Sequence, residues 1–296
     1  MSTRYLAIVN PEARSGAARR LKVEIEQKLA DLNVTYLETT APLEAIELAE
    51  QGRDYDVVIA VGGDGTVHEI VNGLMRIGED RRPALALIPV GSGNDTCRMI
   101  GSPTDIDEAI AVLRRNTSKT FDLGKCNDEF LVNSFSIGID ALTVARTLKI
   151  KEETGRSGML LYGQALIQII LFELEATRLD VAIDGVVQQR GVLVYTVTNG
   201  RTYGGGFKIN PSAKPDDGTL TLSYIEWMPT LKTLTKIPPL LRGTHPKLKE
   251  YSVEEVTAVT FTSSDGSKLI AQIDGELLEG RSFAIEVRPS ALRFIV

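Results

Sequence analysis

Two glycine turns in the first third of the sequence each carry an aspartate. The first, Gly62-Gly-Asp-Gly-Thr66, follows the apolar run 57–61, and the second is Gly91-Ser-Gly-Asn-Asp95. A glycine turn between a strand and a helix leaves backbone N–H groups free to bind phosphate. Asp64 would repel a bare phosphate, so it indicates a bound cation, which we expect to be Mg²⁺. The alternative is a tight strand-to-helix turn with Asp64 as the N-cap.

A third aspartate, Asp122, ends another apolar segment. Because the carboxyl ends of parallel strands share one edge of a sheet, Asp64, Asp95 and Asp122 can converge there, and three carboxylates suit a hydrated magnesium ion. Glu69 and Asn72 lie on the helix after the first turn. Glu69 follows Thr66 by three residues, a capping-box spacing, so a helix cap and a ligand contact both remain open for it.

The loop after the first strand is another candidate phosphate site. It runs from Asn10-Pro11 to Ser15-Gly16 and contains Arg14 as a mobile cation. A simple strand-to-helix connection explains the same residues equally well. The sequence has no Gly-Lys-Ser/Thr motif, which argues against a P-loop ATPase.

Two later motifs also carry carboxylates. Asp274-Gly-Glu276 contains two neighbouring carboxylates, and its Asp-Gly pair is typical of a hairpin turn at the end of a strand. Pro215-Asp-Asp-Gly218 is typical of a β-turn. The three glycines 204–206 indicate close backbone packing or a flexible lid.

The elements that must position these residues alternate as strand and helix in the first part of the chain. Such alternation predicts a doubly wound parallel α/β sheet, whose ligands bind at the carboxyl ends of the strands. The expected strands are 5–9, 33–38, 57–61 and 84–90, and the expected helices are 17–31, 43–51, 67–77 and 106–114.

Strands dominate after residue 123, and we predict a second, mostly antiparallel β-sandwich domain over 124–289. Asp-Gly pairs at 184–185 and 265–266 are hairpin signals. The expected strands are 125–126, 129–137, 179–183, 186–199, 220–227, 255–263, 268–273 and 281–289.

Composition limits the class of protein. Hydrophobic residues make up 43% and charged residues 24%, as in a soluble globular protein, and the net charge of −6 argues against a nucleic-acid partner. Cys97 and Cys126 are too few and too far apart for a disulfide framework or a zinc site. We expect no signal peptide and a cytoplasmic protein. The apolar run 159–174 is too short and too polar to span a bilayer, which leaves a core helix or membrane docking.

The two glycine motifs together resemble the catalytic domain of the diacylglycerol kinase family, and especially bacterial lipid kinases with an attached β-rich domain. Phosphofructokinases and NAD kinases share only the first motif. The segment 211–220, Pro-x-Ala-x-x-Asp-Asp-Gly-x-Leu, and Asp-Gly-Glu at 274–276 fit the same family. The resemblance implies that residues 290–296 return to the first domain, which then comprises 1–123 and 290–296.

The resemblance also implies site residues. An aspartate–water–magnesium network would involve Asp64, Asp95 and Asp122, while Asp217 would bind a structural Mg²⁺ with the carbonyls of Lys214 and Thr219. It does not decide between Thr39 and Thr40 as the residue that contacts ATP. The positions expected to bind nucleotide are Asn10, Pro11, Arg14, Ser15, Gly16, Thr39, Thr40, Gly62, Gly63, Asp64, Gly65, Thr66, Glu69, Gly91, Ser92 and Asn94.

Glu276 would then accept the proton of the acceptor hydroxyl at the inter-domain cleft, with Asp274 as its partner. Two neighbouring carboxylates raise one another's pKa, and the residues alone do not separate the two, although we favour Glu276. Asp140 matches a position that recognises the lipid head in related sphingosine kinases, or it stabilises the fold. His68 and His245 suggest neither a metal site nor a triad.

The resemblance therefore implies an ATP- and Mg²⁺-dependent lipid kinase that converts diacylglycerol to phosphatidic acid. Its partner would be a lipid substrate at the bilayer surface, with the protein peripheral to the inner face of the membrane, and the family includes homodimers. The alternatives are another acceptor, such as phosphatidylglycerol, a sphingoid base or NAD, and a nucleotide- or lipid-sensing module without catalysis.

Overall fold

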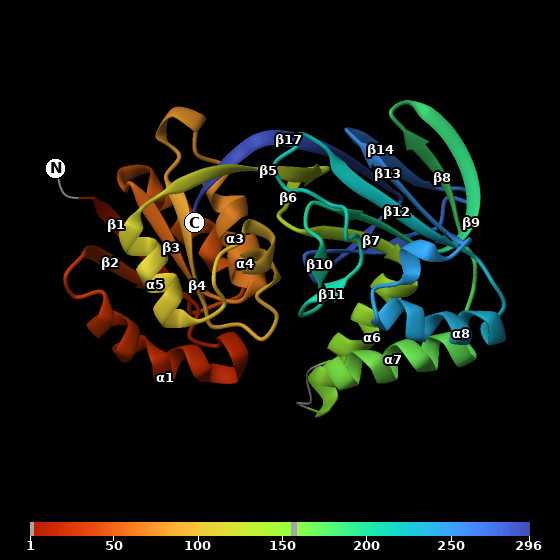
Figure 1. The fold of residues 1–296 in the computed structure, drawn as a ribbon, viewed down its shortest axis with the longest axis horizontal. Helices are drawn as coiled ribbons and strands as arrows, with labels where there is room; N and C mark the ends of the chain where they lie inside the picture. Colours follow the sequence, from red (N-terminus) through yellow and green to blue (C-terminus); the bar gives the residue numbers. More distant parts are fainter. Residues whose placement is uncertain (1–2, 155–158) are drawn as a thin grey trace. The chain divides into compact units, whose positions relative to one another are not determined.

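The computed structural model describes residues 3–154 and 159–296, and the chain forms two compact units. Unit 1 comprises Met1–Leu123 and Pro289–Val296, and unit 2 comprises Gly124–Arg288. Two strands, β5 (Ser118–Cys126) and β17 (Ser282–Ile295), each contain residues of both units (Figure 1). Each unit is described by itself below.

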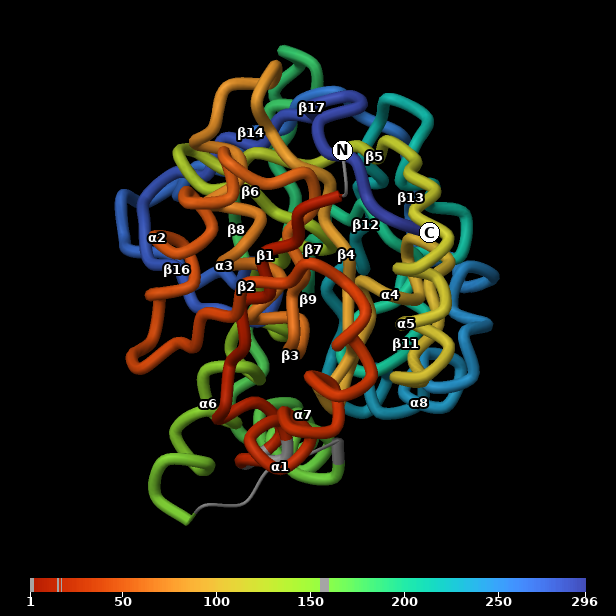
Figure 2. Tube along the Cα trace, turned by 90° about the vertical axis from the view of Figure 1, so that its left-hand side faces the viewer, coloured from red at the N-terminus to blue at the C-terminus, as the bar shows by residue number. Residues whose placement is uncertain are grey.

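Unit 1 is built on a parallel sheet with the order β2-β1-β3-β4. Every residue of β3 and β4 is buried, as expected for strands covered on both faces. The end of β17 joins β4 in parallel, with Phe294 opposite Leu85, so the C-terminus lies in this unit (Figures 1 and 2). The strands are β1 (Arg4–Val9), β2 (Asn33–Glu38), β3 (Val57–Gly62) and β4 (Ala84–Pro89).

Helices cover both faces of this sheet, which confirms the doubly wound prediction. Apolar side chains of α1 and α5 pack on one face, and those of α2 and α3 lie on the other. The helices are α1 (Ala13–Lys28), α2 (Glu44–Glu50), α3 (Asp64–Leu74), α4 (Asp95–Ile100) and α5 (Ile106–Arg115), with 3₁₀ turns η1 (Gln51–Asp54) and η2 (Glu79–Arg81).

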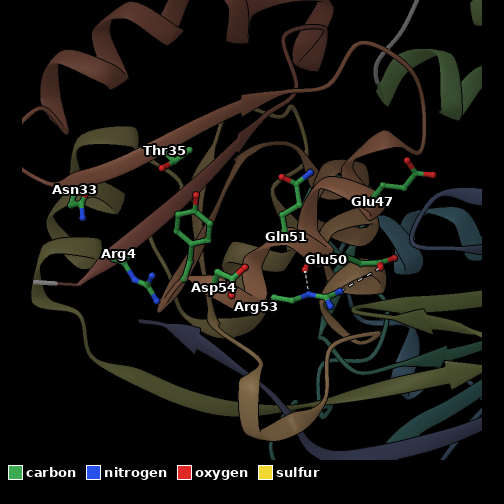
Figure 3. Close-up of a pocket in the computed structure, with 9 residues that line it drawn as sticks. Arg4, Asn33, Thr35, Glu47, Glu50, Gln51, Arg53 and Asp54 are labelled. Atoms are coloured by element: carbon green, nitrogen blue, oxygen red, sulfur yellow. Dashed lines mark hydrogen bonds and ion pairs between the residues drawn. The ribbon is translucent and has the colours of Figure 1, made fainter. Parts of the chain in front are cut away.

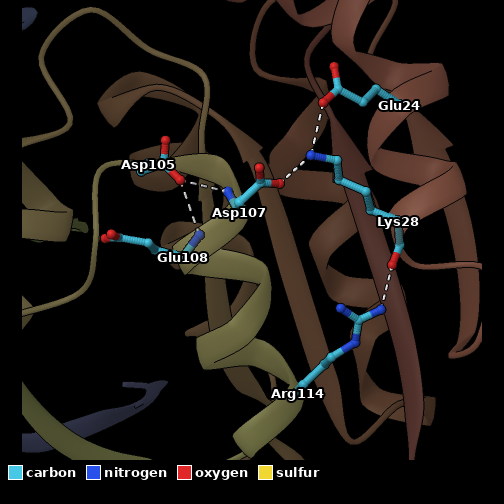
Figure 4. Close-up of polar contacts among 6 residues, drawn as sticks. All are labelled: Glu24, Lys28, Asp105, Asp107, Glu108 and Arg114. Carbon is cyan, nitrogen blue, oxygen red and sulfur yellow. Dashed lines mark hydrogen bonds and ion pairs between the residues drawn. The ribbon is translucent and has the colours of Figure 1, made fainter.

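Polar contacts connect α1 to α5 (Figure 4). Lys28 forms an ion pair with Asp107, and Arg114 Nη2 donates to the Lys28 carbonyl at 2.6 Å. Asp105 is the N-cap of α5 and accepts from the backbone N–H groups of Asp107 and Glu108 at 2.9 and 3.1 Å. A carboxylate in this position satisfies N–H groups that have no partner within the helix.

Three helices of unit 1 differ from the prediction. Helix α1 begins at Ala13 rather than at residue 17, because Asn10 Oδ1 accepts from the Glu12 N–H and starts the helix early. Arg14 and Gly16 therefore lie in its irregular first turns, with φ of 50° and 82°. Helix α3 ends at Leu74 rather than near residue 77, and α4 was not predicted, because six residues are too few to show a helical period.

Unit 2 is an antiparallel, β-rich domain, as predicted. Its strands follow the order β16-β15-β7-β9-β8-β14-β17, while β12 pairs with β9 and β13, and a short hairpin joins β10 and β11. One face of the sheet carries a large apolar core with Phe135, Tyr195 and Phe261 at its centre. The strands are β6 (Glu129–Leu131), β7 (Ser134–Gly138), β8 (Thr177–Ile183), β9 (Val186–Thr198), β10 (Thr202–Tyr203), β11 (Phe207–Lys208), β12 (Leu220–Glu226), β13 (Tyr251–Val256), β14 (Ala258–Ser263), β15 (Leu269–Ile273) and β16 (Glu276–Gly280).

Unit 2 also contains the helices α6 (Ile139–Thr154), α7 (Met159–Phe172) and α8 (Thr230–Leu241), and the 3₁₀ turn η3 (His245–Lys247). Only α7 was expected. The α6 sequence has no clear apolar stripe and α8 contains Pro238 and Pro239, so both lack the usual helical signal. Among the described residues, no helix has both the length and the apolar character needed to cross a membrane.

One of the two predicted hairpins is wrong. Asp184 and Gly185, with φ of 43° and 88°, join the paired strands β8 and β9, as expected for a type I′ turn. Asp265 and Gly266 instead connect β14 to β15, which pair with other strands and not with each other. The Asp265 carboxylate accepts from the Ser267 N–H at 2.9 Å, so the Asp-Gly pair forms a local turn without a hairpin.

Candidate active site

The two glycine turns of unit 1 contact each other. Gly63 is the N-cap of α3, which begins at Asp64, and Asn94 is the N-cap of α4, which begins at Asp95. A Cβ atom on Gly91 would lie 2.5 Å from the Cα of Gly63 and would clash with it, so this position requires glycine. Asn94 Nδ2 donates to the Gly91 carbonyl at 3.1 Å and holds the second turn in place.

Asp64 is held between the two turns. Its Oδ1 accepts from the backbone N–H of Thr96 at 3.0 Å. Burial, and next the negative charge of Asp95, raise the pKa of the Asp64 carboxyl against the lowering effect of the Thr96 hydrogen bond. Two carboxylates in a half-buried turn fit a divalent cation. Its charge would offset both the burial of the Asp64 carboxylate and its repulsion by Asp95.

Asp122 does not join these two carboxylates in a direct site. It is buried in the middle of β5 rather than at a strand end, and its Oδ1 accepts from the Ser290 N–H at 2.7 Å. Within residues 3–154 and 159–296, no three His, Cys, Asp or Glu side chains are grouped so that they could hold one metal ion. A magnesium network that reaches the three aspartates through water therefore stays a prediction.

The first loop lies against the first glycine turn. Asn10 Nδ2 donates to Thr66 Oγ1 at 3.0 Å, which brings together two residues that were predicted to bind nucleotide. A Cβ atom on Gly62 would lie 2.4 Å from Thr66 Oγ1, so this turn also needs its glycine. Pro11 is buried and Arg14 is exposed.

Two other residues that were predicted to bind nucleotide lie on the same two turns. Ser92 is exposed on the second glycine turn, and Gly65 lies in the first turn of α3. The side chain of Ser15 lies outside the described part of the chain.

Thr39 and Thr40 have different surroundings. Thr39 is buried, and its N–H donates to the Val9 carbonyl at 3.0 Å. Thr40 Oγ1 donates to Glu44 Oε2 at 2.9 Å at the start of α2. Thr40 thus stabilises a helix start, which was one of its two predicted roles.

The predicted capping box of Thr66 and Glu69 is wrong. Thr66 lies inside α3, whose N-cap is Gly63, and Glu69 Oε2 accepts from the Ala45 N–H in the first turn of α2 at 3.2 Å. Asn72 Nδ2 donates to the carbonyl of His68 at 3.0 Å in the core of unit 1.

In unit 2, Asp274 anchors a tight turn. Asp274 and Gly275, with φ of 50° and 97°, form the two-residue turn between β15 and β16. The Asp274 carboxylate accepts from three backbone N–H groups, those of Val132 at 2.7 Å, Asn133 at 2.9 Å and Ser134 at 2.8 Å. Asp274 therefore holds the turn against the start of β7.

Glu276 follows this turn and is different. It is the first residue of β16 and is exposed, and within the described residues no side chain or N–H group is paired with its carboxylate. Of the two carboxylates in Asp-Gly-Glu, Glu276 is therefore the one whose oxygens can receive a proton without breaking a hydrogen bond of the turn.

A buried polar cluster surrounds Asp140 in the first turn of α6. Its carboxylate accepts from Ser136 Oγ and from the hydroxyl of Tyr162 on α7, and Gln272 Nε2 lies 3.5 Å away. Burial and the Asp140 charge raise the pKa of the Tyr162 and Tyr203 hydroxyls well above 10. Sequence reasoning missed the two tyrosines and Gln272, because they come from three distant segments without a shared motif.

Asp217 and His245 of unit 2 each form hydrogen bonds within the unit. Asp217 is exposed, and its Oδ1 accepts from the N–H and Oγ1 of Thr219 at 3.1 and 2.9 Å, as in a turn. The structural magnesium site with Lys214 stays a prediction. His245 is fully buried, with Nε2 at 2.7 Å from the Ile209 carbonyl.

A cavity of about 650 Å³ opens at the other end of the unit 1 sheet (Figure 3). Its lining comes from the amino ends of β1 and β2 and from η1, where Arg53 Nε donates to the Glu50 carbonyl at 3.0 Å. The two glycine turns instead follow β3 and β4, at the carboxyl ends of the strands, where α/β sheets bind their ligands. No predicted site residue lines this cavity, which is bordered by Arg4, Asn33, Thr35, Glu47, Glu50, Gln51, Arg53, Asp54 and Tyr55.

Comparisons with known proteins match two successive parts of the chain. The family model of the diacylglycerol kinase catalytic domain matches residues 4–126, and that of the YegS C-terminal NAD kinase beta sandwich-like domain matches residues 133–296. The chain belongs to the diacylglycerol kinase family of lipid kinases. Membership of a kinase family implies ATP as the phosphoryl donor.

Relatives match along nearly the whole chain. A diacylglycerol kinase of Staphylococcus aureus (strain bovine RF122 / ET3-1) is 30% identical over 287 residues, which cover 93% of this chain and 87% of the relative. A diacylglycerol kinase of Bacillus subtilis (strain 168) is 28% identical over 275 residues, 91% and 88% of the two chains. A solved chain from Bacillus anthracis str. Sterne has the same fold, with a TM-score of 0.81 at 24% identity over 99% of this chain and 96% of that chain.

Proposed function

We propose that this lipid kinase transfers the γ-phosphoryl group of ATP to the hydroxyl of diacylglycerol, in a reaction that depends on Mg²⁺. The observation that carries the proposal is the contact between the two glycine turns, with Asp64 held between them. The first N–H groups of α3 have no acceptor within the helix and are suited to a phosphate. Gly63 and Gly91 let the two turns pack backbone against backbone, which brings the starts of α3 and α4 together.

The cation would be held beside Asp64 and Asp95. Burial, and to a smaller extent the charge of Asp95, raise the pKa of Asp64, so a positive charge there stabilises the ionised site. When bound, Mg²⁺ would neutralise charge that develops on the transferred phosphoryl group. Asn10 and Thr66, joined by a 3.0 Å hydrogen bond, would orient the nucleotide from the first loop.

Glu276 is the proposed proton acceptor. Phosphoryl transfer to an alcohol needs a group that takes the hydroxyl proton as the oxygen attacks. The Glu276 carboxylate is exposed and unpaired among the described residues, whereas the Asp274 carboxylate holds three backbone N–H groups. We assign proton acceptance to Glu276 and positioning of the turn to Asp274.

The proposed partner is a bilayer that contains the lipid substrate, bound through α7 and α8. These helices lie side by side (Figure 1). On α7, the apolar side chains of Leu160 and Phe172 are 92% and 79% exposed. Leu231 on α8 is 80% exposed, and neither helix contains an acidic residue. Nearby Arg242 and Lys247 are exposed and suit anionic lipid headgroups.

The test is phosphoryl transfer from labelled ATP to hydroxyl lipids in mixed micelles with Mg²⁺. Diacylglycerol, phosphatidylglycerol and a sphingoid base are each supplied alone. Labelled phosphatidic acid from diacylglycerol is the expected result. Transfer to another lipid would overturn the proposed acceptor, and ATP binding without transfer to any lipid would identify a sensor instead of an enzyme.

A further inference from the structure

Gln272 connects the Asp140 cluster to the turn before Glu276. Its side chain, 2% exposed, lies on β15 two residues before the turn. Gln272 Oε1 accepts from the Gly275 N–H at 2.8 Å, and Gln272 Nε2 faces Asp140 Oδ2 at 3.5 Å. One side-chain amide therefore contacts both a buried carboxylate and the backbone of the turn.

Only one orientation of this amide satisfies both neighbours. The Gly275 N–H is a donor and requires the amide oxygen, while the Asp140 carboxylate is an acceptor and requires the amide NH₂ group. Reversing the amide would set two donors against each other at one end and two acceptors at the other. The orientation of Gln272 is thus fixed, and with it the position of Gly275.

The turn is held from two sides. The Asp274 carboxylate holds it to the backbone of 132–134, and Gln272 holds the next residue, Gly275. Asp274 has a φ of 50°, a conformation that is uncommon for a residue other than glycine and that its three hydrogen bonds support. Glu276 follows directly, so the direction of its side chain depends on both anchors.

Asp140 extends the connection to other elements. It also accepts from Ser136 on β7 and from Tyr162 on α7, and its charge acts on Tyr203 of β10. The start of α6, which carries Asp140, thereby fixes the far end of Gln272. A disturbance of this cluster would reach Gly275 through a single side chain.

We propose that Gln272 is a positioning residue for phosphoryl transfer, which sets the direction of the Glu276 carboxylate through the chain Asp140–Gln272–Gly275. The inference rests on the proposed function, in which Glu276 accepts the hydroxyl proton. A carboxylate that is displaced by about 1 Å loses a large part of its catalytic effect. Gln272 would therefore act on turnover and leave binding of ATP to unit 1 unchanged.

The test compares Gln272→Met with a matched control, Ser223→Ala. Methionine keeps the length of glutamine but can neither donate nor accept as the amide does. Ser223 lies in the same cross-strand row of buried polar residues, through Ser136 and Thr196, and is 2.7 Å from Thr196 Oγ1. The control thus loses a buried hydrogen bond on the same sheet without touching the turn.

Three quantities are measured for each protein: kcat and KM for ATP with diacylglycerol, the melting temperature, and the hydrogen-exchange rate of the Gly275 amide. Gln272→Met should lower kcat by roughly 10- to 100-fold, leave KM for ATP within about twofold, and speed exchange at Gly275. Ser223→Ala should have a melting temperature close to that of Gln272→Met, but its kcat should stay nearer to the wild-type value. Its hydrogen-exchange rate at Gly275 should equal that of the wild type.

Unchanged kcat in Gln272→Met, unchanged exchange at Gly275, or an equal loss of kcat in both variants would each overturn the role of Gln272. These results differ from a failure of the proposed function, in which the wild-type protein itself would transfer no phosphate to any lipid.

Discussion

The backbone N–H of Thr96 donates a 3.0 Å hydrogen bond to Oδ1 of Asp64, and so connects the first turn of α4 to the first residue of α3. The bond holds a carboxylate where burial and the charge of Asp95 oppose its ionisation. An arrangement that costs stability in the free protein is expected where a cation and a phosphate chain bind.

Asp64→Asn should stabilise the metal-free protein and abolish its kinase activity. A folded-state pKa above the unfolded value means that stability is lost as pH rises from about 3.9 through the raised pKa, so the carboxylate is unfavourable at pH 7. Asparagine keeps the oxygen that accepts from Thr96. We expect the free energy of unfolding in urea to rise at pH 7, and kinase activity to fall at least about 100-fold. A variant that is less stable than wild type would contradict the account of Asp64.

Substitutions of the two carboxylates of the 274–276 turn should have different effects, one on stability and the other on catalysis. Asp274→Ala leaves three backbone N–H groups without their acceptor, and we expect a loss of about 2–4 kcal/mol in urea unfolding. Glu276→Gln changes an exposed side chain, so its stability should stay within about 0.5 kcal/mol while kcat falls at least about 100-fold. The reverse pattern would assign proton acceptance to Asp274.

These roles show what the sequence could and could not predict. Uninterrupted apolar runs such as 57–61, and glycine turns that follow them, predicted the parallel sheet and the turn that carries Asp64, because local patterns decide both. The contact of Gly63 with Gly91, the three hydrogen bonds of Asp274 and the position of Gln272 depend on strand order and register. Those tertiary relationships leave no periodic signal in the chain. Helix α8 was missed because its prolines contradict local propensity.

Gly91→Ala should damage the nucleotide site. The new Cβ would lie 2.5 Å from the Cα of Gly63, so the two turns must separate. We expect a loss of about 1–3 kcal/mol and at least about tenfold weaker ATP binding by isothermal calorimetry. Gly163→Ala is the control, because its Cβ meets no atom within 4 Å on α7 and should stabilise the helix by about 0.5–1 kcal/mol. Normal ATP binding by Gly91→Ala would refute the proposed place of the phosphates.

His245 should make stability depend on pH. Burial lowers the pKa of His245 against a smaller opposing effect of the Ile209 carbonyl, so the folded protein keeps the ring neutral. Stability is then full above the unfolded pKa of about 6.5 and falls as pH drops below it, by up to about 1.4 kcal/mol per pH unit. His245→Phe retains the ring contacts with Phe207 and Tyr251 and should show a shallower fall in urea unfolding between pH 7.5 and 5.5. Equal slopes for the two proteins would contradict this.

Charge on the outer side of α7 or α8 should prevent membrane binding. Leu160→Glu and Leu231→Glu each place a carboxylate on the proposed docking surface, whereas Val187→Glu changes an exposed apolar residue on β9, outside that surface. In sedimentation with vesicles of phosphatidylcholine and phosphatidylglycerol, the first two variants should bind at least about tenfold more weakly than wild type, and Val187→Glu should bind normally. Equal binding by all three variants would contradict the proposal that α7 and α8 bind the membrane.

The central claim is tested most directly by transfer of labelled phosphate from ATP to diacylglycerol in mixed micelles, with wild type, Asp64→Asn and Glu276→Gln side by side. The account predicts labelled phosphatidic acid from the wild type with Mg²⁺, and little product from either variant although both remain folded. Undiminished transfer by both variants, or no transfer by a wild type that binds ATP, would contradict it.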